Sequence, residues 1–225
     1  MAQRNLFFPG SLSITLRPSR WIHFSDANGE ICTISPIHHT FDIDFDNVSK
    51  CLYSVHLGGH VIKFSLESQS IVWSSRIGTD SICLLNRCSL SGNLLLVGDM
   101  YSSDLHILST DTGEIIQKLS HPSLQSCCTS MVMGRGIIAQ AGGCGGDLTI
   151  LYLSSDLSIE SCVSINTGGI PRTLAIDEPN EALKLIYPSG ASELYFYGTD
   201  AVVENDTDPN DMVCIIRQLM GTTVS

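Results

Sequence analysis

The sequence is short of positive charge and of charge altogether. Its 225 residues include 12 Lys and Arg against 23 Asp and Glu, which gives a formal net charge of −11, and only 16% of the residues are charged. A protein that binds nucleic acid mainly through phosphate needs a positive face, so we do not expect a nucleic-acid partner. The 43% content of hydrophobic residues excludes disorder over most of the chain, because it is enough to build a core.

Signals for export and for membrane insertion are also missing. No window reaches 18 uninterrupted apolar residues, and the first nine residues lack the apolar run of a signal peptide. The nine cysteines are irregularly spaced and include no Cys-x-x-Cys pair, which argues against zinc ribbons and thioredoxin-like sites. We therefore expect no membrane partner, a reducing compartment and mostly buried thiols. The expected location is the cytoplasm, with the nucleus left open.

No strong catalytic motif occurs. There is no Gly-x-Ser-x-Gly elbow, and no nucleophile has an identifiable base. The glycine cluster Gly142–Gly146 superficially resembles a phosphate loop, but it lacks the lysine, and an alternating, strand-like segment follows it instead of a helix. We predict a hairpin turn there. We assign no catalytic residue, cofactor-binding residue or metal ligand, and no cofactor. Whether the chain is an enzyme is left open, although a chain without catalytic activity is favoured.

Two further patterns each have a functional and a structural interpretation. The adjacent Cys127 and Cys128 could form a vicinal disulfide or redox switch, but no basic neighbour would lower a thiol pKa, so we favour two buried thiols on a strand. Asp42, Asp44 and Asp46 have the spacing of a calcium-loop start. The loop glycine and the final glutamate are missing, so we favour a strand with Phe41, Ile43 and Phe45 on the face opposite the three carboxylates.

The histidines and the acidic C-terminal stretch are less specific. His56 and His60 could face one another across a hairpin, but no third metal ligand is evident among the seven histidines, which are His23, His38, His39, His56, His60, His106 and His121. Residues 199–211 hold five acidic side chains and no basic one. This stretch could dock a basic partner, although a solvated linker or a loop between repeats is the favoured interpretation. The apolar run Met212–Ile216 could then start another strand.

The strongest signal is an internal repeat of about 43 residues. Four segments read as an apolar strand, a turn and a second apolar strand: Leu52–Leu66, Leu94–Leu108, Ile137–Leu151 and Leu183–Tyr197. Their starts lie 42, 43 and 46 residues apart. A fifth copy, Trp21–Ile34, starts only 31 residues before Leu52, so the first unit is predicted to be short or irregular. Repeats at such a period indicate an array of equivalent structural units.

Each repeat contains two further candidate strands. A strand is predicted before each hairpin, within Thr40–Ser49, Ser81–Asn93, Ser126–Gly136 and Arg172–Asn180. A fourth strand follows the hairpin, most clearly at Glu67–Trp73 and at Thr110–Gln117, where Asp111-Thr112-Gly113 is a tight-turn signal. Four strands per repeat with almost no helical periodicity predict an all-β protein. The predicted fold is a β-propeller of four-stranded antiparallel blades, which bury both faces by stacking.

The repeat resembles those of the quinoprotein-like (PQQ-like) and WD-repeat β-propeller superfamilies, over about residues 20–200. Val61–Trp73 is similar to the quinoprotein repeat, in which a strand, a Thr-Gly-like turn and a strand ending in Trp follow one another. Leu105–Ile116 also matches, although Gln117 stands where the Trp would be. The chain has no Trp-Asp dipeptide, the hallmark of WD repeats. The resemblance implies a propeller. At about 43 residues per blade, 225 residues hold about five blades, either as a small ring or, as we favour, as part of a larger one.

These observations define the expected domains and functions. We expect an N-terminal extension over 1–19, propeller repeats over 20–199, and an acidic segment with a C-terminal strand over 200–225. The favoured function, by analogy of fold, is a non-catalytic scaffold for protein–protein interaction. The alternative implied by the resemblance is a quinoprotein-like region of an enzyme. That enzyme would be a quinone-dependent dehydrogenase or an adenylate-forming protein of the aminoadipate-semialdehyde dehydrogenase type.

Overall fold

In the computed structural model of the chain, the described part consists of β-strands joined by turns and loops, without a helix. The residues described are 4–7, 13–16, 22–26, 29–34, 40–78, 85–99, 102–124, 128–142, 147–167, 173–177, 182–187, 190–197 and 200–204. They form two compact units, Met1–Lys118 and Leu119–Ser225.

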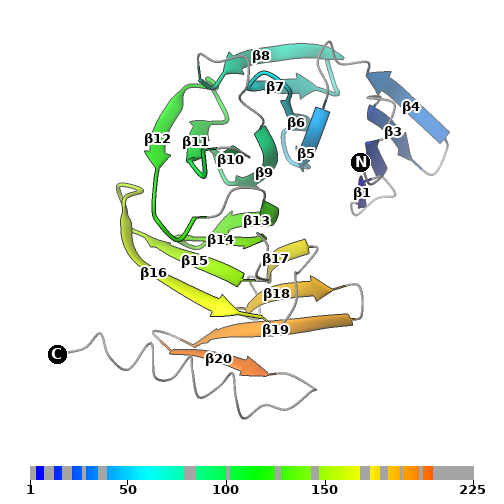
Figure 1. The fold of residues 1–225 in the computed structure, drawn as a ribbon. Helices are drawn as coiled ribbons and strands as arrows, with labels where there is room; N and C mark the ends of the chain where they lie inside the picture. Colours follow the sequence, from blue (N-terminus) through cyan, green and yellow to red (C-terminus); the bar gives the residue numbers. More distant parts are fainter. Residues whose placement is uncertain are drawn as a thin grey trace. The chain divides into compact units, whose positions relative to one another are not determined.

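The first unit contains three four-stranded antiparallel sheets (Figure 1). The first sheet consists of β1 (Arg4–Phe7), β2 (Ser13–Leu16), β3 (Ile22–Asp26) and β4 (Gly29–Ile34). The second consists of β5 (Thr40–Asp46), β6 (Cys51–His56), β7 (His60–Ser65) and β8 (Ser70–Arg76). The third consists of β9 (Leu85–Ser91), β10 (Leu94–Asp99), β11 (Leu105–Ser109) and β12 (Ile115–Leu119). In each sheet the strands lie side by side in chain order, so every connection within a sheet is a hairpin.

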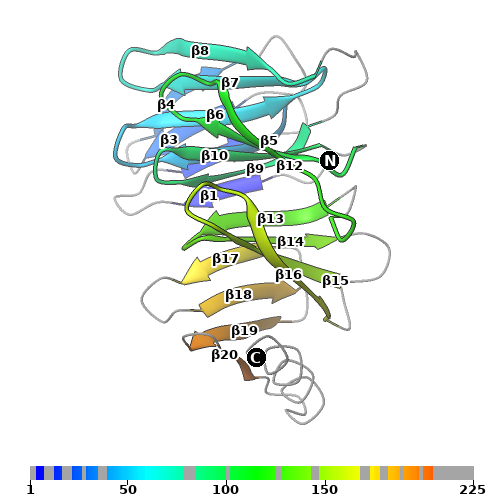
Figure 2. The same cartoon turned by 90° about the vertical axis from the view of Figure 1, so that its left-hand side faces the viewer.

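The second unit contains two more sheets of the same design (Figure 2). The fourth sheet consists of β13 (Cys128–Gly134), β14 (Ile137–Gly142), β15 (Asp147–Leu153) and β16 (Ile159–Asn166). The fifth consists of β17 (Thr173–Asp177), β18 (Ala182–Tyr187), β19 (Gly190–Tyr197) and β20 (Asp200–Glu204). The predicted all-β architecture of four-stranded antiparallel blades is confirmed.

The second strands of the second, third and fourth sheets are buried on both faces, as stacking requires. β6 and β14 are buried at all six positions, and β10 is buried at four consecutive positions from Leu95 to Gly98. In the first unit, a core of Tyr53, Val55, Leu95, Val97 and their neighbours lies between the second and third sheets. An equivalent core in the second unit joins the fourth and fifth sheets. Each fully buried Leu or Val contributes about 1.5–3 kcal/mol, so these two interfaces carry much of the stability.

The first repeat begins earlier than the sequence analysis expected. Residues 1–19, predicted to be an extension, include β1 and β2, which pair with each other and with β3. The predicted fifth copy, Trp21–Ile34, provides the third and fourth strands of its sheet, not the second and third. The second strands of the five sheets start at residues 13, 51, 94, 137 and 182, so their spacings are 38, 43, 43 and 45. The apparent irregularity was a shift of one strand, because the two strands that open the sheet have only four residues each.

At the C-terminal end, part of the acidic stretch is also strand. Asp200–Glu204 forms β20, which pairs with β19 as the fourth strand of the fifth sheet. A loop or linker was favoured for this region, but the pattern Asp-Ala-Val-Val-Glu supplies β-branched residues suited to a strand. The remaining acidic positions 206, 208 and 211, and the apolar run 212–216, lie outside the described residues.

Candidate interaction surface and the polar sites around it

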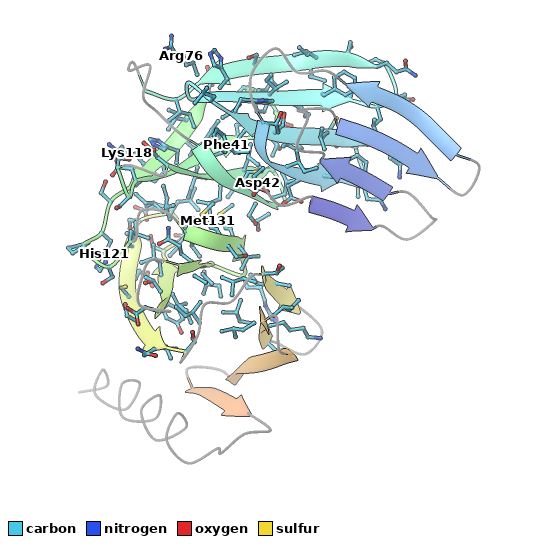
Figure 3. The ribbon with its side chains drawn as sticks, turned by 45° about the vertical axis from the view of Figure 1, so that its right-hand side comes forward. Phe41, Asp42, Arg76, Lys118, His121 and Met131 are labelled. Atoms are coloured by element: carbon cyan, nitrogen blue, oxygen red, sulfur yellow. The ribbon has the colours of Figure 1, made fainter. Side chains whose placement is uncertain are left out.

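The acidic run on β5 links the second sheet to the third. Asp42 is 1% exposed, and its Oδ2 accepts a hydrogen bond from the backbone N–H of Cys88 on β9, at 3.0 Å. Two residues later, Oδ2 of Asp44 accepts from the N–H of Leu90, at 2.8 Å. Each carboxylate therefore accepts a hydrogen bond from a backbone N–H of the adjacent sheet, so these two charged groups stabilise the packing of one sheet on the next. Figure 3 shows Phe41 and Asp42 at this inner strand.

A β-bulge explains why the predicted alternation of side chains along β5 holds at Asp42 and Asp44 but fails at Phe41. Asp42 and Asp44 both reach β9, as a shared face requires, but Phe41 also packs on the core between the second and third sheets. It was predicted on the opposite face. The register of β5 against β6 shifts between Thr40 and Asp42, which adds one residue and breaks the period of two at this point. Asp46 is the last residue of β5 and accepts hydrogen bonds from the N–H of Val48 and the hydroxyl of Ser49 in the turn that follows.

The second unit has the same arrangement of a bulge and a hydrogen bond between sheets, with a serine in place of the aspartate. Ser130 on β13 follows a register shift between Cys128 and Ser130, as Asp42 follows the shift at Thr40. Its Oγ accepts a hydrogen bond from the N–H of Leu174 on β17, at 2.8 Å. A bulge and a polar side chain at one position of the inner strand thus join neighbouring sheets in both units.

A tryptophan joins the outer strand of the second sheet to the turn between β11 and β12 of the third sheet. The indole N–H of Trp73 on β8 donates to the carbonyl oxygen of Thr110 at 2.9 Å, and Nζ of Lys63 donates to the same oxygen at 2.9 Å. Ser75 Oγ donates to the carbonyl of Gly113 at 2.6 Å. The Asp111-Thr112-Gly113 turn is therefore held by three donors from the neighbouring sheet.

Gly113 fits this contact only because it has no side chain. Its φ is +74°, and a Cβ atom built there would lie 2.6 Å from Oγ of Ser75 and 2.7 Å from Cε3 of Trp73. The other edge of this cluster is Tyr53, whose ring centroid lies 6.1 Å from that of Trp73 and 5.5 Å from Nζ of Lys63. Burial raises the pKa of Tyr53 above its ordinary range, so the phenol is neutral.

The described histidines take structural positions. His56 is fully buried, with Nδ1 3.1 Å from Oγ1 of Thr40 and Nε2 2.8 Å from Oγ of Ser54, so both ring nitrogens are engaged by hydroxyls and neither is left for a metal. His60 begins the next strand, opposite Arg76. His121 accepts a hydrogen bond from the N–H of Ser123.

His106 on β11 is the exception among these polar groups. It is 8% exposed, and its Nδ1 has no hydrogen-bond partner within the described part of the chain. Burial and the nearby Lys118 ammonium lower its pKa, while Asp104 and Asp99 oppose this. The imidazole is therefore held in its neutral form.

Several other predicted features can be placed, and some cannot. Gly142 pairs with Asp147, so Gly142–Gly146 connects the hairpin of β14 and β15 as predicted, although 143–146 themselves lie outside the described residues. Cys128 is buried on β13, while Cys127, like His38 and His39, lies outside them. His23 lies on β3, with its side chain not among those described. Within the described ranges, no three metal-ligating side chains come together. No helix there is long and apolar enough to span a membrane.

Exposed apolar residues gather on the outermost strands, a feature that the sequence analysis missed. Ile71 and Val72 on β8, and Ile115 and Ile116 on β12, are between 48% and 54% exposed. The two pairs occupy equivalent repeat positions, 44 residues apart, directly before Trp73 and Gln117. Consecutive apolar residues on a regular strand point to both faces, so in sequence both pairs read as ordinary core, although a register shift between β7 and β8 places Val72 at a bulge. Only the position of β8 and β12 at sheet edges reveals the exposure.

Comparison with solved structures identifies the fold. The WD40 domain of coronin from Toxoplasma gondii superposes on the chain with a TM-score of 0.67 and 14% sequence identity. The match covers 87% of this chain and 55% of that chain, so this chain corresponds to about half the length of its structural neighbour. No protein-family model and no curated protein sequence matches the chain. The chain therefore has the fold of a WD-repeat-like β-propeller, built from four-stranded antiparallel blades.

Proposed function

We propose that this chain is a protein-interaction module, whose outer strand β8 contacts a protein partner. The observation that supports it most is the exposed apolar pair Ile71 and Val72, held on a rigid edge by the anchored Trp73. Exposed apolar residues grouped on an ordered edge are typical of docking surfaces. Likeness to a WD40 domain agrees with this function at the level of fold alone.

The polar groups of the scaffold support the same proposal. Asp42, Asp44 and Ser130 bind backbone donors of neighbouring sheets, and His56 is held by Thr40 and a second hydroxyl. The two aspartates and Ser130 maintain the stacking of neighbouring sheets, and His56 holds β5 and β6 together within one sheet. Their hydrogen-bonding capacity is directed to protein atoms, which suits a scaffold better than acid–base chemistry.

Site-specific photocrosslinking tests the proposal. A photoreactive phenylalanine analogue replaces Val72, and the same analogue replaces Ser68, an exposed polar residue in the adjoining turn, as the matched control. We expect a defined adduct with another protein at position 72 and not at 68, and we expect Val72→Lys to lower the affinity for that protein. Equal labelling at both positions, or no adduct with another protein, would contradict the proposal.

The alternative, a quinoprotein-like repeat region, has one observation in its favour. Trp73 and Thr112-Gly113, the residues that carry the resemblance, lie in contact, since Trp73 on the outer strand of one sheet packs on the Gly113 turn of the next. The described residues do not fit a quinone or calcium site, however, because Asp42 and Asp44 are committed to backbone amides and Cys128 is buried. A quinone with Ca²⁺ should raise the melting temperature if this alternative holds, and an unchanged melting temperature counts against it.

A further inference from the structure

The outer strand of the third sheet carries a self-complementary sequence. Residues 114–118 read Glu-Ile-Ile-Gln-Lys, and β12 is the last strand in its sheet. When two such strands lie antiparallel about a twofold axis at Ile116, Glu114 stands opposite Lys118 of the other copy. The two Ile116 residues then face each other. We propose that a second copy of this chain pairs edge to edge through β12, forming a symmetric dimer.

The backbone has the correct phase for this pairing. The carbonyl of Glu114 accepts a hydrogen bond from the N–H of Ser109, at 2.9 Å, so the backbone groups of Glu114 point inward to β11. Backbone groups alternate along an antiparallel strand, so those of Ile115 and Gln117 point outward. With the axis at Ile116, Ile115 of one copy lies opposite Gln117 of the other, and these residues exchange the hydrogen bonds.

The side chains complete the match. Glu114, Ile116 and Lys118 share one face of the strand, because side chains alternate. In this register Glu114 and Lys118 of opposite copies form a non-hydrogen-bonded pair, the arrangement in which facing side chains come closest. Figure 3 labels Lys118. Lys118 pairs with Asp104 at 2.7 Å, yet its side chain remains 55% exposed and is available to a second carboxylate. Ile115 and Ile116, each 48% exposed, lose water on pairing.

The equivalent strand of the second sheet lacks the charges and so serves as the control. β8 has Ser70 and Ser74 at the positions that correspond to Glu114 and Lys118, and Val72 at the position of Ile116. The same twofold pairing of β8 would therefore form no ion pair. This difference assigns the self-pairing edge to β12. The outer strand β8 then remains available for the protein partner proposed above. The short paired segment implies a weak, concentration-dependent dimer.

Sedimentation equilibrium of the intact chain, over concentrations up to millimolar, tests the proposal. Ile116→Lys places two ammonium groups opposite each other at the axis and should weaken self-association by about ten-fold or more, whereas Val72→Lys should leave it unchanged. Glu114→Lys and Lys118→Glu should each weaken association, and the double charge swap should restore it. Circular dichroism of each variant checks that it is folded.

Three results would overturn the dimer through β12. The first is a wild-type chain that remains monomeric at all concentrations. The second is a dimer that Ile116→Lys does not weaken, and the third is equal weakening by Val72→Lys and Ile116→Lys. Failure of the double swap to restore association would refute the antiparallel register. None of these results depends on the binding of another protein at β8, so the two proposals fail separately.

Discussion

Replacing Gly113 by Ala should destabilise the interface between the second and third sheets through two separate effects. An L-residue at φ +74° costs about 1–2 kcal/mol in backbone energy. The new Cβ would lie 2.6–2.8 Å from atoms of Ser75 and Trp73, so the indole or the turn must move. Overpacking of this kind costs about 1–3 kcal/mol. Together these effects predict a loss of about 2–5 kcal/mol in the free energy of unfolding.

Gly92→Ala is the matched control for the backbone effect. Gly92 has φ +57° and no atom within 4 Å of a built Cβ, so its substitution should cost only about 1–2 kcal/mol. Urea unfolding followed by Trp73 fluorescence, in a Trp21→Phe background, gives both free energies. In a Trp73→Ala background, with unfolding followed by circular dichroism, the excess cost of Gly113→Ala should shrink, because the ring that the Cβ meets is gone. Equal costs for Gly113→Ala and Gly92→Ala would refute the close packing of Trp73 on the turn.

Three further predictions concern the polar groups. Asp42→Ala should lower the free energy of unfolding in urea by about 1–3 kcal/mol, because it leaves the N–H of Cys88 buried without this acceptor. Asp42→Asn keeps an acceptor oxygen and should lower the free energy of unfolding by less. The opposite order would contradict the acceptor role of Asp42. Ser130→Ala should cost about 1–2 kcal/mol and speed hydrogen exchange of the Leu174 amide, and unchanged exchange would argue against that bond. Burial lowers the pKa of His106 below the usual 6.5, so the unfolded chain binds a proton at this residue more readily than the folded chain, and the free energy of unfolding is highest above pH 6.5 and declines as the pH falls toward the lowered pKa. His106→Gln should flatten this dependence of stability on pH between pH 7 and 5. An unchanged slope would exclude His106 as its source.

The repeat made most of the fold predictable. Apolar hairpins at nearly constant spacing gave the middle strands of four sheets, since residues such as Leu95 and Leu96 must be buried on both faces. The first sheet was misassigned by one strand because β1 and β2 have four residues each, too few for a periodic pattern to stand out. Strand position within a sheet depends on the complete set of neighbours, which local sequence does not specify.

The polar contacts were only partly predictable. The alternation of Asp42 and Asp44 indicated a strand rather than a calcium loop, but their acceptor role depends on amides 46 residues away. The bulge that turns Phe41 toward the same core has no sequence signal of its own. The exposed pairs on β8 and β12 looked like core because their apolar character is the same, and only the edge position distinguishes them.

Partner binding and self-association should be measured together in two variants, Val72→Lys and Ile116→Lys. The protein crosslinked at position 72 serves as the partner, and sedimentation reports the dimer. We predict that Val72→Lys loses the partner and keeps the dimer, while Ile116→Lys keeps the partner and loses the dimer. If both variants keep partner binding and the dimer, or if both variants lose partner binding and the dimer, then the assignment of partner binding to β8 and of self-association to β12 is wrong.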